Sequence, residues 1–164
     1  MAASLERQLH QSFTAKGLTL ASAESCTGGL LADRITEVPG SSDYYLGGVV
    51  SYAYSAKETL LGVDHDVLAS QGAVNETVAR QMARGVRERL GADVGIGITG
   101  IAGPGGGSEE KPVGLVWIGL SDAAGERAER YQWDSDRAGN KRLSAEAAMR
   151  LLIAWAAAAP ERKK

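Results

Sequence analysis

The chain of 164 residues is poor in the side chains that build disulfides and metal sites: it has one cysteine and two histidines. The single cysteine, Cys26, excludes an intramolecular disulfide, which is typical of proteins in a reducing cytoplasm. His10 and His65 have no partner at metal-ligand spacing, so we expect no metal site. No apolar run approaches the ~18 residues of a membrane span. The first ten residues include Glu6 and no long apolar run, unlike a signal peptide. We therefore expect a cytoplasmic protein that does not bind membranes.

The chain also lacks a surplus of positive charge. Its 18 Lys and Arg residues face 20 Asp and Glu, for a formal net charge of -2. Phosphate-backbone binding usually needs a concentrated basic surface, so we expect no nucleic-acid partner. The 44% of hydrophobic and 23% of charged residues are ordinary for a globular protein. The length fits one domain, which we expect to span residues 1–164.

Hydrophobic periodicity predicts helices and strands in alternation. Leu5, Leu9 and Phe13 recur at a helical step, while residues 44–54 are rich in Tyr and Val as in a strand. Asn75 is a suitable N-cap for a long helix that follows it. Helices are predicted near 5–16, 30–36, 57–61, 76–90 and 136–155, and strands at 18–23, 44–54, 93–98, 113–120 and 127–133. This order predicts an α/β fold: a three-layer α/β/α domain with a mixed, mostly parallel sheet.

Polar residues and glycines follow three of the predicted strands, in residues 24–29, 51–57 and 99–104. Ligands of open α/β sheets bind in the crevice beyond the carboxyl ends of the strands. If the three strands are parallel neighbours, these segments meet at one pocket. The sequence therefore predicts a functional site at this edge of the sheet.

Ser25 lies where a predicted strand turns into a helix beside Gly28 and Gly29. Free backbone N–H groups at such a turn can stabilise a developing oxyanion, and glycines allow a substrate to approach the backbone. These features favour Ser25 as a nucleophile. The alternative is that Ser25 or Thr27 only caps the following helix.

A serine nucleophile needs a base, and Lys57 is the best candidate. His10 belongs to the first helix and His65 to an exposed turn, so a Ser-His-Asp triad is poorly supported and a Ser-Lys pair is favoured. A lysine base must be buried or near other cations to lose its proton near neutral pH. The alternative is an exposed lysine in the first turn of a short helix.

Three further features allow two interpretations each. Glu24 could hold Mg²⁺, or it could orient backbone or pair with a lysine. The loop at residues 103–107 could cradle phosphate, or it could be a plain turn, because it lacks the Gly-Lys-Ser/Thr ending of a nucleotide-binding loop. Cys26 could be nucleophilic, but without a neighbouring histidine it is better explained as a small buried residue.

Six segments carry a resemblance to a known family. In chain order they read AESCTGG (23–29), VPGSS (38–42), GGVVSY (47–52), GAV (72–74), TGIAGP (99–104) and EKPVG (110–114). Together they resemble the C-terminal domain family of the competence/damage-inducible protein CinA, over about residues 18–155. The resemblance implies a three-layer α/β/α fold and a nicotinamide-nucleotide amidohydrolase. Such an enzyme converts nicotinamide mononucleotide to nicotinate mononucleotide and ammonia, without a metal or organic cofactor.

The resemblance also assigns roles by position. It implies Ser25 as nucleophile, Lys57 as base, Tyr52 as a residue that relays a proton or orients the lysine, and Arg137 as the phosphate ligand. Arg142 is the second choice for the phosphate. The substrate-binding residues predicted in this way are Glu24, Thr27, Gly28, Gly29, Thr99, Gly100, Gly103, Arg137 and Arg142.

Two departures from the family pattern leave other functions open. The chain has Ala53 and Tyr54 where the family usually has Ser-Asn, and Gly105 where it commonly has Asp. A module that binds a nucleotide or a partner without turnover is therefore a rival, as is hydrolysis of another amide or of a nucleotide pyrophosphate. The expected partner is the small nucleotide substrate, and a homo-oligomer such as a dimer is left open.

Overall fold

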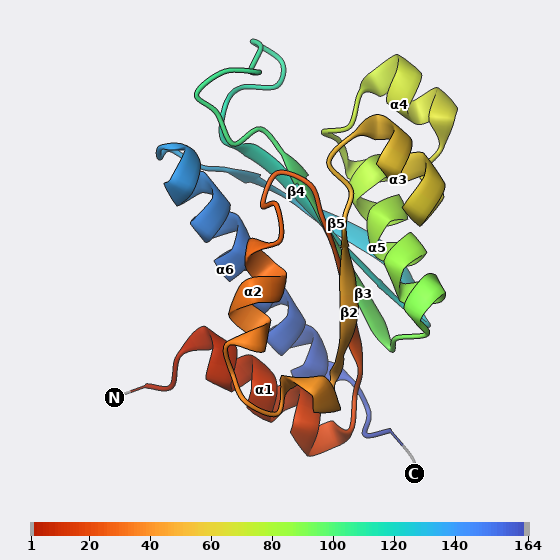
Figure 1. Ribbon diagram of the computed structural model, residues 1–164, viewed down its shortest axis with the longest axis vertical. Coiled ribbons are helices and arrows are strands. Elements are labelled where there is room, and N and C mark those ends of the chain that lie inside the picture. Colours follow the sequence, from red (N-terminus) through yellow and green to blue (C-terminus); the bar gives the residue numbers. More distant parts are fainter. Residues whose placement is uncertain (1, 163–164) are drawn as a thin grey trace.

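The computed structural model describes residues 2–162, which form a five-stranded sheet between two layers of helices (Figure 1). Three strands are parallel neighbours and two are antiparallel, and the sheet is therefore mixed, as predicted. In spatial order the strands are β2 (Tyr45–Val50), β1 (Leu20–Glu24), β3 (Val94–Gly100), β4 (Leu115–Asp122) and β5 (Gly125–Gln132).

Each face of the sheet is covered by its own group of helices (Figure 1). One layer contains α1 (Leu5–Lys16), α2 (Leu30–Thr36) and α6 (Arg137–Ala158), with the 3₁₀ helix η1 (Ser41–Asp43) beside it. The other contains α3 (Tyr54–Leu61), α4 (His65–Gln71) and α5 (Glu76–Leu90). None of the helices within the described residues is long and apolar enough to cross a membrane. The inner strand β1 is buried along its whole length, and the core lies on both sides of it.

Glycines allow α5 to pack directly on the backbone of the sheet. A Cβ atom on Gly95 or Gly97 of β3 would overlap the backbone of α5, and so would one on Gly119 of β4. The nearest atoms to these Cβ positions are the backbone carbonyl oxygens of Ala79 and Ala83. The small residues that alternate through β3 therefore permit close contact of helix and sheet.

Most predicted elements are present, with one omission. Asn75 caps α5 by accepting from the N–H of Val78 at 2.9 Å, and β4 and β5 form the predicted hairpin. The sequence did not predict α4, which buries only Leu68 and begins at His65 after its N-cap Asp64. Its seven residues are too few to show a clear helical period. Asp64, a suitable N-cap residue, is the sequence signal for the start of this helix.

The three strands expected to converge do so. Glu24, the last residue of β1, pairs with Val50 on one side and Ile98 on the other. Because β2, β1 and β3 are parallel, the segments that follow them leave the sheet at the same edge, the one formed by the carboxyl ends of these strands (Figure 1). This edge holds the candidate site.

Candidate active site

Ser25 and Lys57 are in hydrogen-bond contact. Ser25 immediately follows β1 and its N–H donates to the Ile98 carbonyl at 3.0 Å, which extends the sheet by one bond. The Lys57 Nζ lies 2.9 Å from the Ser25 Oγ. Ser25 is 8% exposed and Lys57 is 1% exposed. The structure thus brings together the predicted pair, and the alternative of a solvent-exposed Lys57 is wrong.

Main-chain oxygens hold the amine of Lys57 in place. Its Nζ contacts the carbonyl oxygen of Ser51 at 2.7 Å and that of Tyr52 at 3.3 Å. No carboxylate in residues 2–162 forms an ion pair with it. Burial without a counter-charge lowers the pKa of Lys57 from 10.5 to about 8. A neutral amine is therefore accessible near physiological pH, as a base requires.

The turn after Ser25 leaves several backbone N–H groups free. Gly28 and Gly29 adopt φ angles of 64° and 103°, a conformation that other residues rarely adopt. The N–H of Gly28 donates to the Ser25 carbonyl at 3.1 Å. The N–H groups of Cys26, Thr27 and Gly29 have no acceptor within the described chain. Such groups next to a nucleophile are suited to bind an oxyanion.

Glu24 caps α2 and does not face a substrate. Its two carboxylate oxygens accept from the N–H of Leu31 at 2.9 Å and of Ala32 at 3.1 Å, and the residue is 1% exposed. The prediction of Glu24 as a substrate-binding residue is therefore corrected, because both oxygens already have partners. The cap also answers the alternative for Ser25. The helix is capped by Glu24, and the hydroxyl of Ser25 contacts Lys57 instead.

Tyr52 connects the base to Arg137. The phenol oxygen of Tyr52 accepts from the Arg137 guanidinium at 3.1 Å, and the side chain is 61% exposed. A second guanidinium nitrogen donates to the Gly103 carbonyl at 2.7 Å. The predicted role of Tyr52 is thus corrected in part, because its carbonyl, and not its phenol, contacts Lys57. Arg137 lies at the predicted edge and retains N–H donors for a ligand.

Lys141, and not Arg142, shares the site-facing side of α6 with Arg137. Residues four apart lie near one another on a helix, whereas five residues rotate the side chain by about 140°. The Nζ of Lys141 lies 3.7 Å from the position of a Cβ on Gly28, and Lys141 lines a pocket with Arg137 and Pro104. The i, i+4 spacing of Arg137 and Lys141 is the sequence signal that places both side chains on the same side of α6.

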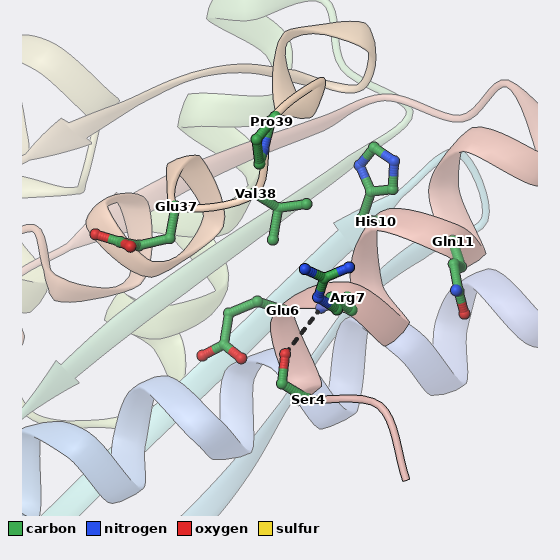
Figure 2. Close-up of a pocket in the computed structure, with 8 residues that line it drawn as sticks. All are labelled: Ser4, Glu6, Arg7, His10, Gln11, Glu37, Val38 and Pro39. Atoms are coloured by element: carbon green, nitrogen blue, oxygen red, sulfur yellow. Dashed lines mark hydrogen bonds between the residues drawn. The ribbon is translucent and has the colours of Figure 1, made fainter. Parts of the chain in front are cut away.

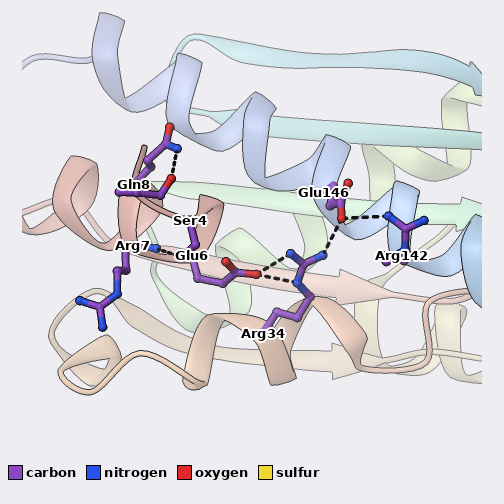
Figure 3. Close-up of polar contacts among 8 residues, drawn as sticks. Ser4, Glu6, Arg7, Gln8, Arg34, Arg142 and Glu146 are labelled. Atoms are coloured by element: carbon purple, nitrogen blue, oxygen red, sulfur yellow. Dashed lines mark hydrogen bonds and ion pairs between the residues drawn. The ribbon is translucent and has the colours of Figure 1, made fainter. Parts of the chain in front are cut away.

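Arg142 belongs to an ion-pair network on another side of α6. It contacts Glu146 at 3.3 Å, and Glu146 also contacts Arg34 at 3.5 Å, which is bound to Glu6 (Figure 3). These contacts join α6, α2 and α1. Arg142, the second choice for the phosphate, is thus paired with Glu146, while Lys141 lies in the pocket with Arg137.

Of the other predicted residues that follow or end β1 and β3, Thr27 and Thr99 are buried and Gly100 is half-buried. The Thr99 hydroxyl donates to the Ala73 carbonyl at 2.8 Å, so it also fixes the loop before α5. Thr27 is fully buried, and its hydroxyl has no partner among the described residues. A Cβ on Gly100 would overlap Val116, so this glycine serves close packing of β3 on β4.

Cys26 is a poor nucleophile in this setting. It is 7% exposed, and burial raises the pKa of its thiol to about 12. Metal chemistry has no visible support either, since residues 2–162 contain no group of three or more His, Cys, Asp or Glu side chains that could hold a metal.

A separate polar pocket lies between the first turns of α1 and the chain after α2 (Figure 2). It is lined by Ser4, Glu6, Arg7, His10, Gln11, Glu37, Val38 and Pro39. None of the predicted site residues contributes to it. The chemistry described above is therefore confined to the edge where β1, β2 and β3 end.

Comparison with known proteins identifies the family. The model of the CinA C-terminal domain matches residues 2–155 of the chain. The chain belongs to the CinA C-terminal domain family. A CinA-like protein of Salinibacter ruber is 57% identical over 145 residues, which are 88% of this chain and 35% of that protein. A putative competence-damage inducible protein of Moorella thermoacetica is 57% identical over 138 residues, 84% of this chain and 33% of that protein.

Solved structures of the CinA superfamily share the whole fold. The competence/damage inducible protein CihA of Agrobacterium tumefaciens has a TM-score of 0.88 at 39% identity, and the match covers 94% of this chain and 96% of that one. The competence damage-inducible protein A of Klebsiella pneumoniae has a TM-score of 0.90 at 30% identity, with the same coverage. The chain spans about a third of the length of the curated CinA-like relatives named above.

Proposed function

We propose that the chain is an amidohydrolase that converts nicotinamide mononucleotide to nicotinate mononucleotide and ammonia, as a cytoplasmic step of pyridine nucleotide salvage. One observation carries the proposal: the buried amine of Lys57, free of any carboxylate, contacts the hydroxyl of Ser25 at 2.9 Å. The chemistry suited to this pair is acyl transfer from an amide. The nucleotide as substrate is what the resemblance to the CinA family implies, and membership in that family is consistent with it.

The surroundings of Lys57 favour a base directed at Ser25. A neutral amine has two N–H donors and one lone pair. The carbonyl oxygens of Ser51 and Tyr52 can only accept, so they take the two donors. The lone pair is then left for the Ser25 hydroxyl, which donates its proton to it.

The reaction would follow in two halves. Lys57 takes the proton as the Ser25 Oγ attacks the carboxamide carbon, and the oxyanion is held by backbone N–H groups of the turn, such as those of Cys26 and Gly29. Lys57 then returns the proton to the departing nitrogen, and ammonia leaves an acyl-enzyme. Water then attacks the acyl carbon as Lys57 takes one of its protons, and Lys57 returns that proton to the departing Ser25 Oγ, which releases nicotinate mononucleotide and restores the free enzyme.

The phosphate of the nucleotide would be bound at α6. The N–H groups of Leu31 and Ala32 at the start of α2 already donate to the carboxylate of Glu24, so they are not available to the phosphate. Arg137 and Lys141 bring two positive charges to the pocket beside Pro104. A guanidinium can bind phosphate with two charge-assisted hydrogen bonds.

The test is ammonia release from nicotinamide mononucleotide by purified protein and by Ser25→Ala. We expect the variant to lose several orders of magnitude in rate while its circular dichroism and ligand affinity stay close to wild type. Cys26→Ala is the matched control one residue away, and it should keep its rate within a few fold.

Two results would reject the proposal. One is a Ser25→Ala rate above about a tenth of wild type, because loss of a covalent nucleophile costs far more. The other is binding of the nucleotide without any ammonia release, which would indicate a nucleotide-binding module instead. Hydrolysis of a nucleotide pyrophosphate that is lost on chelation and restored by Mg²⁺ would support the rival enzymatic function instead.

A further inference from the structure

The strand β5 forms one edge of the sheet, and its outer side has no partner strand within residues 2–162. It is eight residues long and pairs with β4 in unbroken register from Gly125 to Gln132. We propose that a second copy of the chain pairs with this edge, antiparallel and with a two-fold axis at Ala128, so that two sheets join into one. This inference is independent of the proposed enzymatic activity.

The backbone of β5 is oriented for such pairing. The Leu115 carbonyl accepts from Ile101, on the side of β3, and therefore points away from β5. Its partner Gln132 must then direct its own N–H and C=O outward, because backbone groups alternate along an antiparallel pair. By the same alternation, Glu126, Ala128 and Arg130 present their backbone groups to the open edge.

The charges on β5 are self-complementary about Ala128. The segment from 126 to 130 reads Glu-Arg-Ala-Glu-Arg. When it pairs antiparallel with itself at Ala128, Glu126 faces Arg130 of the second copy and Arg127 faces the second copy's Glu129. Each pair occurs twice, so four opposite-charge contacts form and no like charges face each other. Opposite charges directly across a strand pair stabilise it.

These pairs fall on two faces of the sheet. Glu126 contacts Arg84 of α5 at 3.0 Å, so it lies on the α5 face. Arg127 and Glu129 lie on the other face, where they line a groove with the apolar side chains of Leu151 and Trp155 of α6. Arg127 forms no ion pair within the described chain. Its charge is therefore available to a partner.

The opposite edge, β2, is built differently. It carries no charge, but its register with β1 shifts between Leu20 and Ala21, and Gly47 has a φ of 143°. A bulge in an edge strand is a common device against edge-to-edge pairing. Of the two edges, β5 is thus the regular one.

The first test is the oligomeric state of the wild-type chain by analytical ultracentrifugation from roughly 1 to 300 µM. This wide range is needed because an interface made by one pair of edge strands is small and is expected to be weak. We expect a dimer that dissociates on dilution. Arg127→Glu should raise the dissociation constant at least about tenfold, because it places Glu opposite Glu at two positions. The double variant Arg127→Glu with Glu129→Arg restores opposite charges and should return to within about threefold of wild type.

A cysteine introduced at Ala128 gives a second measurement. Two residues facing each other in a hydrogen-bonded antiparallel pair have Cα atoms about 5.5 Å apart, within the range that a disulfide spans. Oxidised Ala128→Cys should run as a covalent dimer, and Leu46→Cys on β2 should not. Cys26 is buried and does not compete.

Four outcomes would overturn the proposal, provided that circular dichroism shows folded variants. The first is a wild type that stays monomeric throughout the concentration range. The second is an Arg127→Glu dimer as tight as wild type, and the third is a double variant that fails to recover. The fourth is that Leu46→Cys, and not Ala128→Cys, forms the covalent dimer, which would place the interface at β2.

Discussion

The lowered pKa of Lys57 predicts a specific dependence of protein stability on pH. The folded protein releases the proton at about pH 8, whereas the unfolded chain holds it until 10.5. Between these values the unfolded state binds more protons, so the free energy of unfolding rises with pH. Replacing Lys57 with Met, which has similar length and no charge, removes this contribution. The difference in stability between wild type and Lys57→Met should therefore change with pH in favour of the wild type.

The size of the change follows from the two pKa values. At pH 7 the protonation of the buried amine costs the folded state about 3 kcal/mol, and at pH 9.5 about 1 kcal/mol, since each pKa unit corresponds to about 1.36 kcal/mol. The wild type should gain about 2 kcal/mol relative to Lys57→Met over this range. Burial also raises the pKa of Cys26 and Tyr44, to about 12 each, and their titration lowers stability at high pH. The Tyr44 contribution is the same in both proteins and cancels in the difference. The Cys26 thiol interacts with the charge of Lys57, so the comparison is made in a Cys26→Ala background.

Urea unfolding of both proteins at pH 7 and pH 9.5, followed by circular dichroism, measures the difference directly. A Lys57→Arg variant is a second comparison, because its guanidinium keeps its proton over the whole range. A difference between wild type and Lys57→Met that changes by less than about 0.5 kcal/mol would refute the reasoning, since errors of extrapolation are of that order. Lys57 would then be charged in the folded protein and could not serve as a resting base.

Three further predictions concern neighbouring parts of the structure. Arg137→Ala should weaken nicotinamide mononucleotide binding at least about tenfold but leave binding of the dephosphorylated riboside unchanged, as measured by calorimetry, whereas Arg142→Ala should affect neither; equal effects on both ligands would rule out a phosphate contact. Glu24→Gln should lower the free energy of unfolding by about 1–3 kcal/mol in urea titrations, because an amide oxygen cannot satisfy both N–H groups of α2; an unchanged midpoint would contradict the cap. Gly95→Ala should lower the free energy of unfolding by about 1–3 kcal/mol, because the new methyl group would push the Ala83 carbonyl of α5 away from β3. An unchanged thermal midpoint would show that the helix adjusts freely.

Local patterns predicted the fold well where they had a single physical cause. The helical step of Leu5, Leu9 and Phe13 and the cap at Asn75 fix α1 and α5 from neighbouring residues alone. The position of α4 depends on packing of Leu68 into the core cluster beside α5. Seven residues are too few for a helical hydrophobic period to be recognised in the sequence. Short elements of this kind are determined by tertiary contacts more than by propensity.

The candidate site was predictable in its residue types but not in its directions. The strand ends identified Ser25 and Lys57, since parallel neighbours bring their carboxyl ends together. Glu24 and Arg142 were also predicted as substrate-binding residues, and only coordinates show that Glu24 turns back to α2 and Arg142 to Glu146. The rotation of about 100° per residue along a helix distinguishes Lys141 from Arg142 from the sequence alone.

The way in which Lys57 is held has a consequence for sequence drift. Besides the Ser25 hydroxyl, its hydrogen-bond partners among residues 2–162 are carbonyl oxygens, those of residues 51 and 52, which every amino acid supplies. Side chains around the base can therefore be exchanged in evolution without moving it, as long as the backbone path from β2 into α3 is kept. The unusual Ala53 and Tyr54 of this chain lie on that path, and the amine still reaches Ser25 at 2.9 Å. The reactive geometry is thus inherited with the fold of the main chain and tolerates variation that would disable a base positioned by a carboxylate.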